Sequence, residues 1–237
     1  MKKFNSLIVS LVILSGCNIK NEKFVSNLDT VNNILYNCIE EYNKVREYEQ
    51  ASELKEGNNS IVTTLKFNDN KKEFYTCVSE EEKKEEIYVF FENENFYELD
   101  SIEMIAEKKI ATEEGLGSWL KYRSQAYSFL DTIISSEIAL LEMIKPLLET
   151  NVNILGMEII CDNRNSISFS VDNYETEEGV VSFNVVIEDY LLTNLEATID
   201  GISSKASINY TANIEIPNIE GYEIKNPLEN IDNNFFG

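Results

Sequence analysis

The sequence predicts an α+β fold in which a highly curved antiparallel sheet, a half-barrel, wraps a long central helical segment, with a further helix at the N-terminus. Apolar residues recur at helical spacing near the start and again in the middle of the chain. After each of these regions, apolar and polar residues alternate with a period of two, as in strands that have one wet face and one dry face. The connections are short and rich in Asn, Asp and Gly, which is typical of antiparallel hairpins.

The N-terminal helix is predicted to begin near Ser26, which forms a capping-box pattern with Asp29. A single apolar stripe follows at alternating spacings of four and three: Phe24, Leu28, Val31, Leu35, Cys38, Tyr42 and Val45. An exposed coiled coil is the competing interpretation. Because the pattern stops by about Gln50, after two to three heptads, a helix packed on its own domain is favoured.

The first meander is predicted from four alternating stretches, at 60–67, 73–79, 87–92 and 96–100. Turns are expected at 68–70 and 93–95, and the charged run 80–86 is expected to form a solvated hairpin end. Residues 101–111 are expected to form a further strand.

The central helix is predicted over 118–148, after a loop opened by Gly115 and Gly117, and Pro146 is expected to kink or interrupt it. Its apolar arc is wide. Such a helix needs burial on more than one side, as it would have inside a curved sheet.

Strict alternation returns in the last third, at 166–172, 182–188 and 195–200, with turns at Glu178-Gly179 and Asp200-Gly201. The longest alternating stretch, 205–217, is predicted to be a single strand closed by Pro217. The tail after Tyr222 has no period.

The first residues have the features of a targeting segment. Lys2 and Lys3 precede a short apolar run that ends in the sequence LSGC, and this run is shorter than the roughly 20 apolar residues that span a bilayer. LSGC resembles the lipobox of bacterial lipoproteins. The resemblance implies that 1–16 is a signal peptide cut between Gly16 and Cys17, and that Cys17 carries diacylglycerol and palmitate-type acyl chains. Residues 17–23 are then a lipidated tether, and 24–237 a single α+β domain.

The charge of the chain excludes some partners. The formal net charge is −22, and loss of residues 1–16 leaves 221 residues with −24. Such a surface repels phosphates, so nucleic acid and polybasic-type membrane binding are not expected.

The sequence offers little chemistry for catalysis. It contains no histidine, and no nucleophile elbow, phosphate-binding loop or dinucleotide fingerprint is present. No catalytic residue, metal ligand or cofactor is therefore predicted, and an enzyme is not expected. Cys38, Cys77 and Cys161 are interpreted as buried thiols, with a Cys77–Cys161 disulfide as the open alternative.

The closing phrase DYLLTNLEATIDGISSKASINYTANIEIPNI, residues 189–219, resembles the end of proteins with the LolA/LppX-type lipoprotein-carrier fold. The order of predicted elements matches that fold over most of the mature chain. The resemblance implies a concave face that holds lipid or another hydrophobic ligand. Soluble carriers of this type have no anchor, so the lipobox favours a membrane-tethered holder or receptor.

The expected function is therefore that of a non-enzymatic lipoprotein, anchored to the cell membrane and facing outside the cytoplasm, that binds a lipid or hydrophobic small molecule. Several aromatic and aliphatic residues are candidates for lining the cavity: Phe90, Tyr127, Leu130, Ile134, Phe169, Phe183 and Tyr210. The alternative is a surface interaction protein, an adhesin or partner-binding module, with a fully packed core. Under that alternative a contiguous aromatic patch should lie on the outside.

Overall fold

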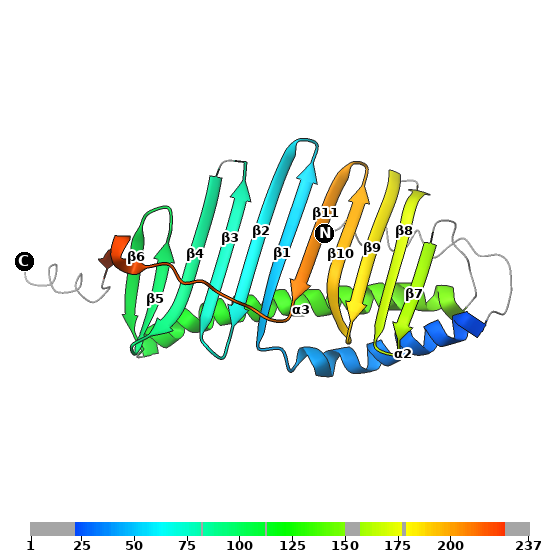
Figure 1. The fold of residues 1–237 in the computed structure, drawn as a ribbon, viewed down its shortest axis with the longest axis horizontal. Helices are drawn as coiled ribbons and strands as arrows, with labels where there is room; N and C mark the ends of the chain where they lie inside the picture. Colours follow the sequence, from blue (N-terminus) through cyan, green and yellow to red (C-terminus); the bar gives the residue numbers. More distant parts are fainter. Residues whose placement is uncertain (1–21, 82, 112, 150–156, 177–178, 226–237) are drawn as a thin grey trace, which may run out of the picture. The chain divides into compact units, whose positions relative to one another are not determined.

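The structure is a computed structural model that describes residues 22–81, 83–111, 113–149, 157–176 and 179–225 (Figure 1). This part of the chain contains an N-terminal helix, a long helix and twelve strands. The predicted α+β class is confirmed. The described residues divide into two compact units. The first unit contains 22–44, 54–58 and the stretch 130–207, and the second contains 45–53, 59–129 and 208–225.

The sheet of the first unit is an antiparallel meander in the order β11-β10-β9-β8-β7. Its strands are β7 (Met157–Asn163), β8 (Ser166–Thr176), β9 (Gly179–Glu188), β10 (Leu191–Ile199) and β11 (Ile202–Asn209), the last two residues of which belong to the second unit. Asp200 and Gly201 join β10 to β11 with φ values of 49° and 80°, as a tight hairpin turn requires.

Alternation within these strands buries one face of the first unit. In β8, Ile167, Phe169 and Val171 are each 1% exposed. Helix α2 (Glu22–Tyr42) contributes Val31, Ile34 and Cys38, none of which is exposed to solvent. Val31 and Cys38 belong to the predicted helical stripe, whereas Ile34 does not, and Leu35 of the stripe is only half-buried.

The second unit contains a sheet in the order β12-β6-β5-β4-β3-β2-β1. Its strands are β1 (Glu47–Glu56), β2 (Asn59–Asn68), β3 (Glu73–Glu80), β4 (Lys83–Glu92), β5 (Asn95–Asp100), β6 (Ile105–Ile110) and β12 (Glu223–Lys225). The last three residues of β1 belong to the first unit. Strands β2 to β6 pair antiparallel in succession, whereas β12 pairs parallel with β6. Helix α3 (Glu113–Glu149) contributes its residues 113–129 to this unit.

After β11 the chain leaves the sheet. Residues 210–218, called here the strap, have no regular secondary structure and run across the face of the second unit opposite α3 (Figure 1). The strap leads into the 3₁₀ turn η1 (Ile219–Gly221) and then into β12. The second unit is thus layered as helix, sheet and strap.

The prediction of one strand over 205–217 is wrong, because β11 ends at Asn209. In the strap, Tyr210, Ala212 and Ile214 are half-buried and the residues between them are exposed. An extended segment that lies on the face of a sheet alternates in the same way as a strand within the sheet, so the pattern alone does not separate the two.

The bounds of the N-terminal helix also differ from the prediction. Helix α2 begins at Glu22 instead of Ser26, and it ends at Tyr42 instead of near Gln50. Val45 is buried outside the helix, and Tyr48 belongs to β1, which was not predicted. Val45 happens to continue the helical spacing, and the many charged residues of β1 conceal its alternation.

The long helix begins earlier than predicted, so Gly115 and Gly117 lie inside α3 instead of in a loop. Pro146 does not interrupt the helix, which continues to Glu149. The predicted strands of the first meander are confirmed, including one within 101–111, but the charged run 80–86 contributes residues to β3 and β4. Within the described residues, no helix combines the length and the apolar character needed to cross a membrane.

Candidate functional site

The face of the second unit that carries α3 is filled by aromatic side chains. The Phe67 ring stacks on Trp119, with centroids 6.0 Å apart, and meets Tyr127 edge-on at 5.4 Å. Phe96 stacks on the same Trp119 at 6.2 Å. The Tyr48 hydroxyl donates a hydrogen bond of 2.7 Å to the Ala126 carbonyl oxygen in the middle of α3. Side chains of the helix therefore occupy the space in front of these strands.

A polar network fastens α3 to the turn between β2 and β3. Arg123 Nε and Nη2 donate to the two carboxylate oxygens of Asp69 at 2.9 and 3.1 Å, and Tyr127 Oη donates to Asp69 Oδ2 at 3.0 Å. Burial alone would raise the pKa of Asp69, but these hydrogen bonds outweigh it and hold that pKa below its ordinary value. The network therefore holds α3 in place against the turn between β2 and β3.

The opposite face of this sheet can be assigned from strand alternation. Because Phe96 points toward Trp119, its neighbour Tyr97 points away from the helix, as does Phe90, which pairs with Tyr97 in the register. Phe90 and Tyr97 stack at 5.1 Å and form a buried cluster with Leu99 and Ala106. The cluster is covered by Ile219 and Tyr222, which follow the strap.

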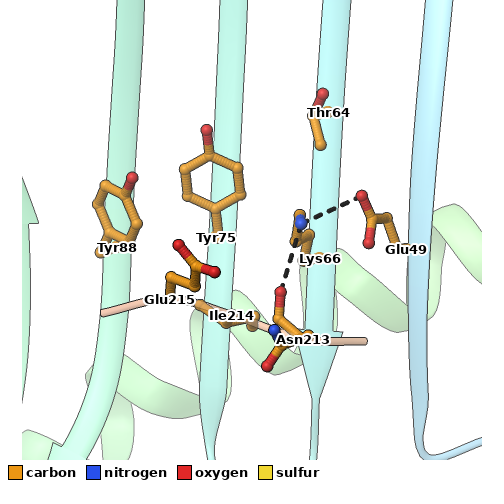
Figure 2. Close-up of a pocket in the computed structure, with 8 residues that line it drawn as sticks. All are labelled: Glu49, Thr64, Lys66, Tyr75, Tyr88, Asn213, Ile214 and Glu215. Carbon is orange, nitrogen blue, oxygen red and sulfur yellow. Dashed lines mark hydrogen bonds and ion pairs between the residues drawn. The ribbon is translucent and has the colours of Figure 1, made fainter. Parts of the chain in front are cut away.

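Beside this covered cluster, the strap and the sheet border an open hollow of about 430 Å³, called here the outer groove (Figure 2). It is lined from the strands and from the strap by Glu49, Thr64, Lys66, Tyr75, Tyr88, Asn213, Ile214 and Glu215. All of these residues belong to the second unit. The volume is in the range of pockets that hold small molecules.

Two tyrosines on neighbouring strands form the aromatic wall of the outer groove. The rings of Tyr75 and Tyr88 lie 4.6 Å apart between centroids, and both hydroxyls donate to Glu86 Oε1, at 2.7 and 3.3 Å. Burial, followed by the hydrogen bond to Glu86, raises the pKa of Tyr75, so the phenol stays neutral. Glu86 is itself paired with Lys84 at 2.9 Å. The two rings are therefore fixed in place by their own hydroxyl groups.

A lysine ties the strap to the strands at the other end of the outer groove. Lys66 Nζ lies 3.1 Å from Glu49 Oε1 and donates to the Asn213 carbonyl oxygen at 3.3 Å. The side chains of Lys66 and Glu49 are 25% and 34% exposed. On the strap, the carboxylate of Glu215 is directed toward Tyr75 (Figure 2). The outer groove thus presents an ammonium, carboxylates, a hydroxyl and two rings within one small space.

The first unit has a hollow of its own, of about 380 Å³, near the turns that follow β7 and β9. Its polar groups bond to one another: Asn165 Nδ2 donates to Asp189 Oδ1 at 2.7 Å, and the Asp189 amide donates to Ser166 Oγ at 3.2 Å. The lining residues of this hollow include no aromatic side chain, whereas two tyrosines line the outer groove, so this hollow is the weaker candidate.

The residues predicted to line a cavity are divided between the two units. Leu130, Ile134, Phe169 and Phe183 belong to the first unit, whereas Phe90, Tyr127 and Tyr210 belong to the second. Phe90 lies on the face opposite α3, away from the helix-side face to which the prediction assigned it. Tyr210 is the first residue of the strap. That these seven residues line one ligand cavity stays a prediction.

The lipidation residues Gly16 and Cys17, together with the predicted signal peptide 1–16, lie outside the described residues. Residues 22 and 23 of the predicted tether 17–23 belong to α2. Cys38, Cys77 and Cys161 are not joined to one another, so the alternative of a Cys77–Cys161 disulfide is not realised. In the part of the chain that the structure describes, no cluster of His, Cys, Asp or Glu could hold a metal ion.

Sequence reasoning did not single out the residues of the outer groove. Glu49 lies in the strand that was not predicted, and Asn213, Ile214 and Glu215 lie in a segment predicted to be a strand. The signal that could have found them is Pro217. Proline has no backbone N–H to donate within a sheet, so an alternating run that ends in proline can leave the sheet before its last residue.

Comparison with known proteins gives structural similarity at low identity. No protein-family model and no curated protein matches the chain. Similar solved structures include an uncharacterized conserved protein from Thermus thermophilus, at 4% identity and a TM-score of 0.32, and LprF from Mycobacterium bovis, at 9% identity and a TM-score of 0.31. The alignments cover 81% and 80% of this chain and 96% of each of the other chains. Neither similarity is close enough to support a functional statement for this chain.

Proposed function

We propose that the protein is a membrane-anchored extracytoplasmic lipoprotein that binds a ligand in the outer groove and catalyses no reaction. The outer groove carries this proposal, because it is a hollow of small-molecule size lined by convergent polar groups and two fixed aromatic rings. On the opposite face of the same sheet, the side chains of α3 pack against the strands. This packing favours a ligand site in the outer groove over one between α3 and the strands of the second unit.

The absence of catalysis is supported by composition. The chain contains no histidine, the side chain that most often acts as a general base near neutral pH. The carboxylates near the outer groove, Glu49 and Glu86, are each paired with a lysine. Such groups are suited to binding and orienting a ligand.

The anchor is tested by the change Cys17→Ala. This change removes the thiol that the lipobox resemblance assigns to diacylglycerol, so the variant should lose incorporation of labelled palmitate and leave the membrane fraction. Cys161→Ala is the matched control and should keep both properties. Unchanged palmitate labelling of the Cys17→Ala chain would contradict the anchor.

A second candidate function is the binding of a lipid or other hydrophobic ligand in the first unit. Phe183 of β9 meets the fully buried Phe169 edge-on at 5.8 Å but is itself only half-buried, and Ile134 of α3 is also half-buried. Apolar surface of this kind suits an acyl chain. The occupant would then contact Phe183 and leave the outer groove empty.

A further inference from the structure

The outer groove contains charged groups of both signs, and this restricts the charge of its ligand. An anion would gain from Lys66 but would face Glu49 and Glu215, whereas a cation would gain from these carboxylates but would face Lys66. Lys66 and Glu49 already neutralise each other at 3.1 Å. Breaking a partly buried pair to bind a charged ligand leaves one partner uncompensated. With this pair intact, the carboxylate of Glu215 leaves the outer groove net negative, so an anion is disfavoured. A ligand without net charge can bind without disturbing the Lys66–Glu49 pair.

The polar groups of the outer groove include both hydrogen-bond donors and acceptors. Lys66 has three ammonium hydrogens and uses two of them, for Glu49 and the Asn213 carbonyl oxygen. Glu215 offers acceptor oxygens, and Thr64 offers a hydroxyl that both donates and accepts. A ligand rich in hydroxyl groups matches such a lining, because each hydroxyl can donate to a carboxylate and accept from an ammonium.

The aromatic wall adds a second requirement. Tyr75 and Tyr88 present neighbouring rings whose hydroxyls are held by Glu86, so the rings can offer contact area at little further cost in conformational entropy. A ligand that meets them needs an apolar face as well as hydroxyl groups at its edges. Sugar rings combine the two, because their C–H bonds form an apolar face and their hydroxyls project from the rim.

We propose that the outer groove binds a neutral carbohydrate of one or two sugar rings. This inference rests on the proposed function, which places the ligand site in the outer groove, and it names the class of ligand. The sugar lies with its C–H face on Tyr75 and Tyr88. Its hydroxyls donate to Glu215 on the strap and accept the remaining hydrogen of Lys66. The volume of about 430 Å³ accommodates a ligand of this size.

The test uses the lipidated chain purified from membranes in a sugar-free detergent and titrated by calorimetry with cellobiose, maltose, lactose and N,N′-diacetylchitobiose. We expect saturable binding of at least one disaccharide.

Tyr88→Ala removes half of the aromatic wall and should weaken binding about tenfold or more. Glu215→Gln, on the exposed strap, keeps the fold and should weaken it several-fold. Tyr36→Ala, which changes a side chain 86% exposed on α2, is the control and should bind as the unchanged chain does.

Choline chloride and inorganic phosphate serve as charged probes. Absence of saturable binding of all four disaccharides would overturn the carbohydrate proposal, and so would binding that both Tyr88→Ala and Glu215→Gln leave unchanged. Binding of choline or phosphate that is lost in Tyr88→Ala would overturn the carbohydrate class and leave the proposed function intact. The proposed function is tested independently of the ligand class. It would be contradicted if the outer groove of the protein held no ligand in the membrane.

Discussion

At the scale of single residues, the least expected group is a carboxyl buried in the first unit. Glu137 of α3 is completely buried, and its Oε2 accepts hydrogen bonds from Tyr42 Oη at 2.7 Å and from the Leu192 amide at 2.8 Å. Among the described residues, its Oε1 has no hydrogen-bond partner. Burial raises the pKa of Glu137 from 4.5 to about 7, although both hydrogen bonds oppose the shift. Glu137 thus joins α2, α3 and β10, and its raised pKa makes the free energy of unfolding depend on pH.

Stability should therefore fall as pH rises. The pKa of Glu137 is higher in the folded chain than in the unfolded chain, so the folded chain binds the proton more tightly between about pH 4.5 and pH 7. From pH 5 to pH 8, the free energy of unfolding should drop by about 2 to 3 kcal/mol on account of this residue. Urea unfolding at both pH values should show that drop in the unchanged chain and not in Glu137→Gln.

Glu142→Gln, an exposed position on the same helix, controls for general charge effects and should retain the drop. Parallel pH profiles for the unchanged chain and Glu137→Gln would refute this account of the buried carboxyl.

At the scale of elements, the start of α3 depends on a glycine. Gly115 lies in the helix at a point where an added Cβ would collide with the Ile110 carbonyl oxygen, a backbone atom that cannot move aside cheaply. Two residues on, Gly117 has open space around its Cα. Gly115 is therefore required for close packing of α3 against Ile110, whereas the structure shows no packing requirement for a glycine at position 117.

The two glycines should respond oppositely to alanine. Gly115→Ala should lower the free energy of unfolding by about 1 to 3 kcal/mol through overpacking. Gly117→Ala should raise it by about 0.5 to 1 kcal/mol, because alanine favours the helix more than glycine does. Urea midpoints of both variants measure the difference. Equal effects of the two changes would mean that α3 does not begin against β6 as described.

Elements also show where sequence reasoning succeeded and where it failed. The strands of both meanders were predictable, because one buried face imposes a period of two. Part of the core of the first unit was predictable from Val31 and Cys38 on α2, because residues that a helix buries along one side recur at helical spacing in the sequence. The strap and β1 were not predictable, since alternation does not distinguish a strand from an extended segment on a sheet. Gly115 was misassigned to a loop because the need for close packing depends on Ile110, which becomes its neighbour only in the folded chain.

At the scale of the whole molecule, the proposed site is a consequence of the strap. Without residues 210–218, Tyr75, Tyr88 and Lys66 would stand on an open sheet face. With the strap, they line a hollow of about 430 Å³ (Figure 2). None of these residues was a sequence-level candidate, because their proximity arises from the path of the strap.

The most direct test of the account is hydroxyl-radical footprinting of the protein in the membranes of the cells that make it, compared with the purified chain after extensive dialysis. If the outer groove holds the ligand, Tyr75 and Tyr88 should be oxidised several-fold more slowly in membranes, whereas Tyr36, 86% exposed, should be oxidised equally in both samples. Equal oxidation of Tyr75 and Tyr88 in the two samples would contradict the proposed site. If Phe183 were protected from oxidation in membranes and Tyr75 and Tyr88 were not, the ligand would be assigned to the first unit.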